Sequence, residues 1–419
     1  MTDIAWIDIA LTNARPQVLG ALLRYFRNLD IAEEAFQEAC LRALKTWPDK
    51  GPPRDPIAWL IFVGRNSGID TVRKQAKMQS LPDEEVISDT GDAESDLAER
   101  LDGSGYRDDI LRLLFICCHP DLPATQQIAL ALRIVSGLSV PQIARAFLVS
   151  DSAMEQRITR AKARVAAAGV AFETPGAVER SERLALVSAM VYLIYNEGYS
   201  AGGTHREAAA FADEAIRLGR LLLRIFPAEP ETMALLALML LQQSRKAARF
   251  DADGQIILLL QQDRKLWNRT SIDEALALLD KAIRHRRPGP YQVQAAIAAL
   301  HSRAKHAADT DWAEIDLLYQ VLERLTPSPV VTLNRAVALS KLKGPEEALA
   351  LIAPLEGQLD SYFYFHGLRG GLLAQLARPQ EARVAFDKAI ALARSPAEAA
   401  HIRHQLDCLS ADATAAAAK

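Results

Sequence analysis

From Ser152 to Arg164, polar and basic side chains recur on one face of a predicted helix, and apolar side chains line the other face. The apolar stripe, expected to be buried, consists of Met154, Ile158, Ala161 and Val165. Hydroxyl, amide and guanidinium groups are the types that reach base edges and phosphates in a DNA major groove. The candidate DNA-contacting residues are Ser152, Gln156, Arg157, Thr159 and Arg160. An ordinary amphipathic helix with a solvated basic face gives the same stripe, so the neighbouring elements must decide between the two interpretations.

Two shorter elements precede this helix at the spacing of a helix-turn-helix. Apolar residues over 128–134 predict a first helix, which is expected to stop at Gly137. Ser139 is a suitable N-cap for a short second helix with Pro141 in its first turn. A tight turn at 150–151 then leads into the third helix. This tripartite spacing favours DNA binding over an isolated amphipathic helix.

The composition bounds the class of protein. The chain has 419 residues, 50% hydrophobic and 24% charged, which is typical of a globular protein with two or three domains. Its formal net charge of -3 provides no global attraction to nucleic acid, so any DNA binding must depend on local patches. The N-terminus lacks the basic and apolar regions expected of a signal peptide, and no run reaches the roughly 18 apolar residues of a membrane span. We therefore expect a cytoplasmic protein without a membrane partner.

The cysteines give little support for a metal site. The four cysteines form no CxxC pair, which suits a reducing compartment. Cys117, Cys118 and His119 are the one compact group of soft ligands, but no second group lies nearby to complete four ligands. Buried thiols at a helix end are the favoured interpretation. We expect no metal, no cofactor and no catalytic residues.

A helix predicted over Ile31–Trp47 has an acidic face with one apolar residue on it. The buried face is expected to hold Ala32, Phe36, Cys40, Ala43 and Trp47. The opposite face carries Glu34, Gln37, Glu38 and Leu41. A partner protein with a basic helix would fit such a face, although singly exposed leucines are common and need no partner.

The next helical stretch, over residues 56–77, begins apolar and ends basic. It combines aromatic rings, an amide and cations, which are the groups that hold an unstacked base and its phosphates. These residues are Trp59, Phe62, Arg65, Asn66 and Arg73. By the alternative interpretation, the two aromatic side chains simply belong to the core. Residues 81–102 follow with nine acidic residues and one basic residue, which predicts a flexible linker.

Three segments in this order resemble a bacterial RNA polymerase sigma factor of the extracytoplasmic-function type, over about residues 10–168. They are AEEAFQEACLRAL, WLIFVGRNSGIDTVRK and, after the acidic linker, GLSVPQIARAFLVSDSAMEQRITRAKARV. The resemblance implies that the first segment docks on the clamp helices of core RNA polymerase through Glu34, Gln37, Glu38 and Leu41. It implies that the second melts and reads the −10 element through Trp59, Arg65, Asn66, Asp70 and Arg73. The third would read the −35 element through Ser152, Gln156, Arg157, Thr159 and Arg160. Glu155 departs from the basic residue that many members carry, which leaves the −35 sequence open.

The chain continues for about 250 residues beyond Val165 with internal repeats. The segments IDEALALLDKAI at 272, PEEALALIAPLE at 345 and PQEARVAFDKAI at 379 are alike, and the last two begin 34 residues apart. This period is the signature of tetratricopeptide repeats, whose stacked helix pairs form a groove for a protein or peptide partner. The whole chain thus resembles the sigma factor subgroup with a tetratricopeptide-like C-terminal extension.

The sequence therefore predicts an all-α protein with two small sigma domains, the second with a helix-turn-helix, followed by an α-solenoid of tetratricopeptide-like helix pairs. The expected ranges are 10–80 for the polymerase-docking and −10 domain, 81–105 for the linker, 106–168 for the −35 domain, 181–270 for a helical connecting domain and 271–407 for the repeats. The expected function is promoter-specific initiation with core RNA polymerase and promoter DNA as partners, regulated by the repeats. The alternatives are a helix-turn-helix regulator acting on its own operator and a repeat scaffold for protein interactions.

Overall fold

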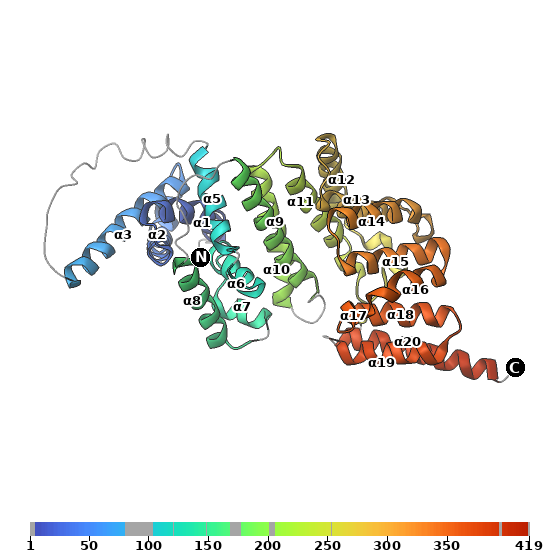
Figure 1. The fold of residues 1–419 in the computed structure, drawn as a ribbon. Helices are drawn as coiled ribbons and strands as arrows, with labels where there is room; N and C mark the ends of the chain where they lie inside the picture. The colour runs from blue at the N-terminus through green and yellow to red at the C-terminus, as the bar shows by residue number, and fades with distance from the viewer. Residues whose placement is uncertain are drawn as a thin grey trace. The chain divides into compact units, whose positions relative to one another are not determined.

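The computed structural model describes residues 5–79, 104–119, 121–147, 149–167, 177–200, 206–252, 254–393 and 396–417. In these ranges the protein is all-α, as predicted, and the single β pairing is an isolated bridge between Phe250 and Ile256 (Figure 1). The chain divides into two compact units, the first formed by residues 1–198 and 207–215 and the second by 199–206 and 216–419. Residues 81–103 of the expected linker lie outside the described ranges.

The first unit begins with a bundle of helices that pack on one another. These helices are α1 (Ala5–Phe26), α2 (Leu29–Lys50), α3 (Pro56–Gln79) and α5 (Ser104–Cys117). Asn28 caps α2, because its side-chain oxygen accepts hydrogen bonds from the backbone N–H groups of Asp30 and Ile31 at 2.9 and 3.1 Å. Phe36 and Trp47 are buried as predicted, whereas Cys40 is only partly buried.

Helix α2 ends later than the sequence predicts. It was expected to end at Trp47, but it continues to Lys50 with Pro48 inside it. A proline this close to the C-terminus removes a single backbone donor, and the N–H of Gly51 donates to the carbonyl of Trp47 at 2.9 Å to close the last turn. The buried indole of Trp47 stacks on the Trp6 ring, with ring centroids 6.2 Å apart. It also packs against Trp59 of α3, with ring centroids 5.5 Å apart.

The predicted helix-turn-helix is confirmed. Its helices are α6 (Ala124–Ile134), α7 (Val140–Ala146) and α8 (Asp151–Ala167). Gly137 has a positive φ of 74°, which a side-chain-bearing residue would adopt only with strain, and it turns the chain between α6 and α7. Ser139 caps α7 in a reciprocal capping box: its backbone N–H donates to Gln142 Oε1 at 2.8 Å, and its hydroxyl accepts from the Gln142 N–H. All four residues of the predicted α8 stripe are buried.

Helices α9 (Ala177–Ser200) and α10 (Arg206–Ile225) contribute to both units, because the division falls at residues 198–216. The remaining helices of the second unit follow one another as packed neighbours (Figure 1). They are α11 (Pro230–Gln243), α12 (Arg269–Arg284), α13 (Pro290–Arg303), α14 (Trp312–Leu325), α15 (Pro329–Lys343), α16 (Pro345–Ile352), α17 (Glu356–Leu359), α18 (Phe363–Gln375), α19 (Pro379–Leu392) and α20 (Pro396–Ala417).

The 34-residue period appears in this unit as repeated packing. Arg335 of α15 donates to Asp316 and Glu323 of α14 at 2.8 and 3.0 Å, and 34 residues later Arg369 of α18 pairs with Glu356 of α17. Between α18 and α19, a Cβ at Gly370 would lie only 2.5 Å from the Phe386 ring, so glycine permits this close approach. At two positions 34 residues apart, an arginine thus joins its helix to the preceding one by an ion pair.

Residues 244–268 depart from the helical pattern expected across 181–270. They form three short 3-10 turns and the isolated bridge, with Gly254 at a positive φ of 77° in the bend between the bridged residues. The connection is closed at its base, where the N–H of Asn268 donates to the carbonyl of Ser244 at 2.9 Å. Its glycine and its bonded turns replace helix where the 3.6-residue apolar pattern is interrupted.

Candidate nucleic-acid interface

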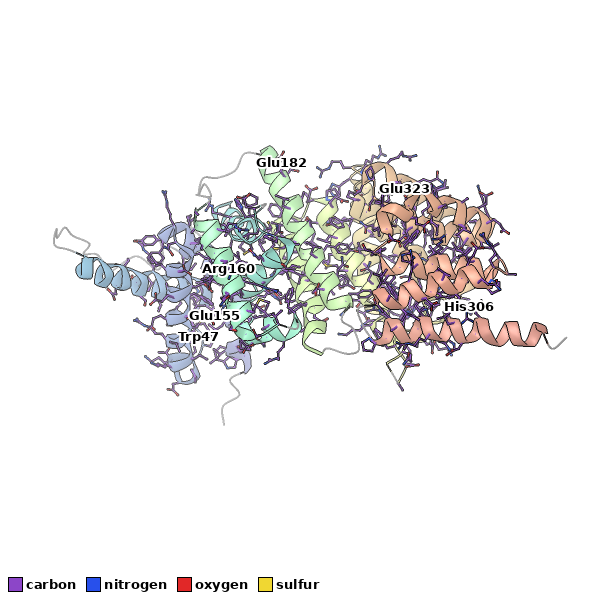
Figure 2. The ribbon with its side chains drawn as sticks, turned by 60° about the horizontal axis from the view of Figure 1, so that its bottom comes forward. Trp47, Glu155, Arg160, Glu182, His306 and Glu323 are labelled. Carbon is purple, nitrogen blue, oxygen red and sulfur yellow. The ribbon has the colours of Figure 1, made fainter. Side chains whose placement is uncertain are left out.

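The polar face of α8 is exposed over its whole length. Ser152, Gln156, Thr159 and Arg160 are exposed and Arg157 is partly buried. Arg160 Nη2 donates to Gln156 Oε1 at 3.3 Å, which aligns the guanidinium and the amide side by side on the helix surface. Glu155 lies on the same helix (Figure 2). The geometry leaves guanidinium, amide and hydroxyl donors free to meet the edges of base pairs.

The acidic face of α2 is likewise accessible. Glu34, Gln37 and Leu41 are exposed, and Glu38 makes an exposed ion pair with Arg42 at 3.4 Å. Leu44, which the sequence analysis missed, adds a second apolar side chain to this face, with Leu41 at 51% and Leu44 at 47% exposure. Their spacing of three residues is a signal that places both on one helix face. Two exposed leucines side by side favour a protein partner more strongly than one does.

The candidate residues on α3 divide into packed and free side chains. Trp59 is partly buried against Trp47, so part of its ring serves the core. Asn66 and Asp70 are exposed, and the side chain of Arg73 lies outside the described residues. Arg65 lies over the ring of Tyr25, with Cζ 4.5 Å from the ring centroid.

Tyr25 is a further candidate that sequence reasoning missed. Its ring is 46% exposed and lies on α1, forty residues before its cation partner Arg65, so the pattern of α3 carries no sign of it. An exposed aromatic ring beside a guanidinium is a surface on which a base can stack.

An ionic junction centred on the buried Glu33 joins α8 to α2. Lys162 Nζ pairs with Asp30 at 2.9 Å and with Glu33 of the same helix. Glu33 also pairs with Arg15 of α1 at 3.5 Å, and the Arg15 guanidinium donates to the carbonyls of Ile134 and Arg133 at 2.8 and 3.3 Å. The C-terminus of α6 is thereby held as well, since cations stabilise free carbonyls there.

This junction touches the end of the acidic α2 face. Asp30 precedes Glu34 by one helical turn and continues the line of exposed side chains toward Leu41. Lys162 lies on α8 between the buried stripe and the polar face. The Lys162–Asp30 contact therefore places α8 beside the start of the line of exposed side chains on α2.

The charge state of Lys162 is set by the junction. Burial alone would lower its pKa, but hydrogen bonds and charge attraction from Glu33 and then Asp30 outweigh burial and hold the pKa above the ordinary 10.5. A raised pKa means that this stabilisation is complete below pH 10.5 and is lost as the pH rises through the folded-state pKa. Lys162 consequently keeps its positive charge near neutral pH.

We expect Lys162→Met to lower the free energy of unfolding of the first unit by about 1–3 kcal/mol, because the buried Glu33 loses one of its two cationic partners. The measurement is urea unfolding followed by circular dichroism at pH 7. Lys45→Met, at an exposed position of α2, is the matched control. Identical urea midpoints for the two variants would show that the junction contributes nothing to stability.

The thiols near α5 are buried, not exposed to ligands. Cys117 and Cys118 are 0% and 1% exposed, and burial raises the pKa of the Cys118 thiol to about 12. In the part of the chain that the structure describes, no group of three or more His, Cys, Asp or Glu residues is placed to hold a metal ion. No helix among the described residues is long and apolar enough to cross a bilayer.

Comparisons with known proteins match three parts of the chain. Residues 11–78 match the family model "Sigma-70 region 2", and residues 112–165 match "Sigma-70, region 4". Residues 183–283 match "Family of unknown function (DUF6596)". The chain is also 71% identical over 413 residues, 98% of both chains, to "Uncharacterized protein R00370" of Rhizobium meliloti (strain 1021). The two sigma matches contain the α2 and α3 candidates and the α8 candidates, respectively.

Proposed function

Since the chain belongs to the family of extracytoplasmic-function-type RNA polymerase sigma factors with a C-terminal extension, we propose that it brings core RNA polymerase to its own set of promoters under the control of that extension. The observation that carries the first part is the capped helix-turn-helix with an exposed polar α8 face, on the same unit as the α2 face and the α3 candidates. A regulator acting alone on an operator has no use for a second, apolar and acidic docking face.

The proposed roles follow the geometry. Glu34, Gln37, Glu38 and Leu41 contact the polymerase clamp, with Leu44 extending that surface. On α3, Trp59, Arg65, Asn66, Asp70 and Arg73 contact the −10 element, with Tyr25 beside Arg65. On α8, Ser152, Gln156, Arg157, Thr159 and Arg160 contact the −35 element. Arginine pairs with guanine in a bidentate geometry, which makes Arg160 the residue with the clearest expected effect on sequence preference.

We expect Arg160→Ala to weaken promoter binding of the holoenzyme by about 1–3 kcal/mol and to relax one position of the −35 element. The measurement is a footprint on promoter variants substituted singly across the −35 element. Arg303→Ala removes an exposed arginine of the second unit and serves as the control for net charge. A wild-type footprint from Arg160→Ala would mean that another face of α8 meets the DNA.

Regulation by the extension is supported by one contact within the first unit. Phe147, at the end of α7, packs against Phe211 of α10 with ring centroids 6.0 Å apart, and Phe211 is 1% exposed. The helix-turn-helix therefore shares apolar packing with the beginning of the extension. A change in the packing of α10 has a direct route to the DNA-reading module.

Truncation after Ala168 is expected to change the amount of transcript without removing −35 recognition, because α6, α7 and α8 remain while Phe211 is lost. The measurement is run-off transcription with matched amounts of full-length and truncated protein on one promoter, paired with a −35 footprint. Phe211→Ala in the full chain removes the ring contact with Phe147, and circular dichroism checks that the chain stays folded, because Phe211 is buried. Equal transcript from all three proteins, with and without cell extract, would leave the extension without a role in initiation and would favour an independent protein-interaction scaffold.

A further inference from the structure

Residues 244–268 and the start of the next helix bring several arginines together in the sequence of the second unit. The segment itself contributes Arg245 and Arg264, and Arg269 begins the next helix. Among the described residues, no carboxylate forms an ion pair with any of these three arginines, although Asp309 attracts Arg264 from longer range.

One terminal nitrogen of the Arg264 guanidinium is hydrogen-bonded, and the other has no hydrogen-bond partner. Its side chain is 9% exposed, and Nη1 donates to the carbonyls of His301 and, at 2.9 Å, Ala304 at the C-terminus of α13. Its Cζ lies 4.7 Å from the centroid of the Trp267 ring. The Nη2 group is buried and has no hydrogen-bond partner.

A second arginine lies over the same indole. Arg245 Cζ is 6.0 Å from the Trp267 centroid, and its Nη2 donates to the Tyr199 hydroxyl at 3.1 Å. Arg245 is only partly buried, so it forms the side of the group that faces solvent. Two guanidiniums over one ring repel each other, and burial followed by the charges of Arg245 and Arg269 lowers the pKa of Arg264.

Further buried hydrogen-bond groups without partners belong to Trp267, His301 and Thr310. Trp267 Nε1 and Thr310 Oγ1 are buried without partners, and their residues are 3% and 5% exposed. His301 Nδ1 is also buried without a partner. Burial, then the charges of Arg245 and Arg264, lowers the pKa of His301 to about 4, so its ring is neutral at pH 7.

An acceptor would satisfy each of these groups. An indole N–H and a guanidinium can only donate, and a hydroxyl and a neutral imidazole can each donate one hydrogen bond. Buried donors in folded proteins nearly always have partners. Arginines favour carboxylate and phosphate oxygens because two parallel N–H groups match them.

We propose that Arg245, Arg264, Trp267, His301 and Thr310, here called the arginine–tryptophan cluster, bind a small anion of phosphate or carboxylate chemistry. The donors are too deeply buried for a polymer backbone, which excludes DNA as the occupant. Arg264 and Trp267 supply the fixed inner donors, and Arg245 closes the site on the solvent side. The cluster gives the extension a chemical input that does not depend on DNA.

The test is titration of the full-length protein with sodium phosphate and, separately, sodium succinate against sodium chloride of equal ionic strength. Thermal unfolding and isothermal titration calorimetry are the readouts. We expect a saturable rise in Tm and a stoichiometry of one anion per chain. Saturation by phosphate alone or by succinate alone assigns the ligand to phosphates or to organic acids. Saturation by both supports the shared chemistry.

Variants separate binding from folding. Arg245→Gln is expected to weaken binding at least tenfold, and Thr310→Val, which removes one donor at nearly constant volume, is expected to weaken it less. Both should match the wild type in circular dichroism and in Tm in chloride. Arg303→Gln, an exposed arginine that pairs with Asp280 at 3.6 Å, should bind like wild type. No saturable response to either anion, or wild-type affinity in both cluster variants, overturns the proposal. Because neither polymerase nor DNA is present, the result is independent of promoter recognition.

Discussion

Met154→Asp is expected to unfold the helix-turn-helix and to abolish promoter binding. Met154 is 0% exposed in the apolar stripe of α8, and a carboxylate placed there has no cationic partner to offset its desolvation. The cost of several kcal/mol is comparable to the whole stability of a small module. Urea unfolding followed by circular dichroism measures it.

Ala163→Asp supplies the matched control, since it adds the same charge to the same helix at an exposed position. It should unfold at nearly the wild-type urea concentration. If Met154→Asp also unfolded at nearly the wild-type urea concentration, the stripe would not be the buried side of α8. The assignment of the opposite face to DNA would then fail.

Glu34→Lys and Leu41→Glu are expected to weaken binding to core RNA polymerase at least tenfold while leaving the fold intact. Both side chains are exposed on α2, so neither change opens a cavity or buries a charge. A tenfold loss corresponds to about 1.4 kcal/mol, a modest demand on the centre of a docking face. A pull-down with purified core polymerase, together with the helicity of each variant, is the measurement.

Glu182→Lys reverses an exposed charge on α9 and controls for the change in net charge (Figure 2). It should bind core polymerase like wild type. Holoenzyme formation by Glu34→Lys and Leu41→Glu at the level of this control would exclude the α2 face as the docking surface.

Local patterns predicted the local structure well. The cap at Ser139, the turn at Gly137 and the buried stripe of α8 each follow from residue types a few positions apart, and the structure confirms them. The end of α2 was misplaced because a proline such as Pro48 is expected to end a helix. In the last turn, however, a proline removes only one hydrogen bond. The helical expectation for residues 244–268 failed where bonded turns replace the helix.

Contacts between distant segments lay beyond the reach of the sequence. Lys162 meets Glu33 across 129 residues, and neither side chain stands out in its own helix. Tyr25 joins the α3 candidates only because α1 packs beside α3. The arginine–tryptophan cluster draws on segments from 245 to 310, and nothing in the spacing of those residues indicates that Arg245 and Arg264 share one indole ring.

Run-off transcription with purified core RNA polymerase tests the central claim most directly. The template is the DNA upstream of the protein's own coding sequence, and reactions contain core polymerase alone, with the full-length protein, or with Leu41→Glu. We predict a discrete transcript that requires the full-length protein and is lost with Leu41→Glu. A transcript of equal amount from core polymerase alone, or repression of transcription by the full-length protein together with failure to co-purify with core polymerase, would contradict the account.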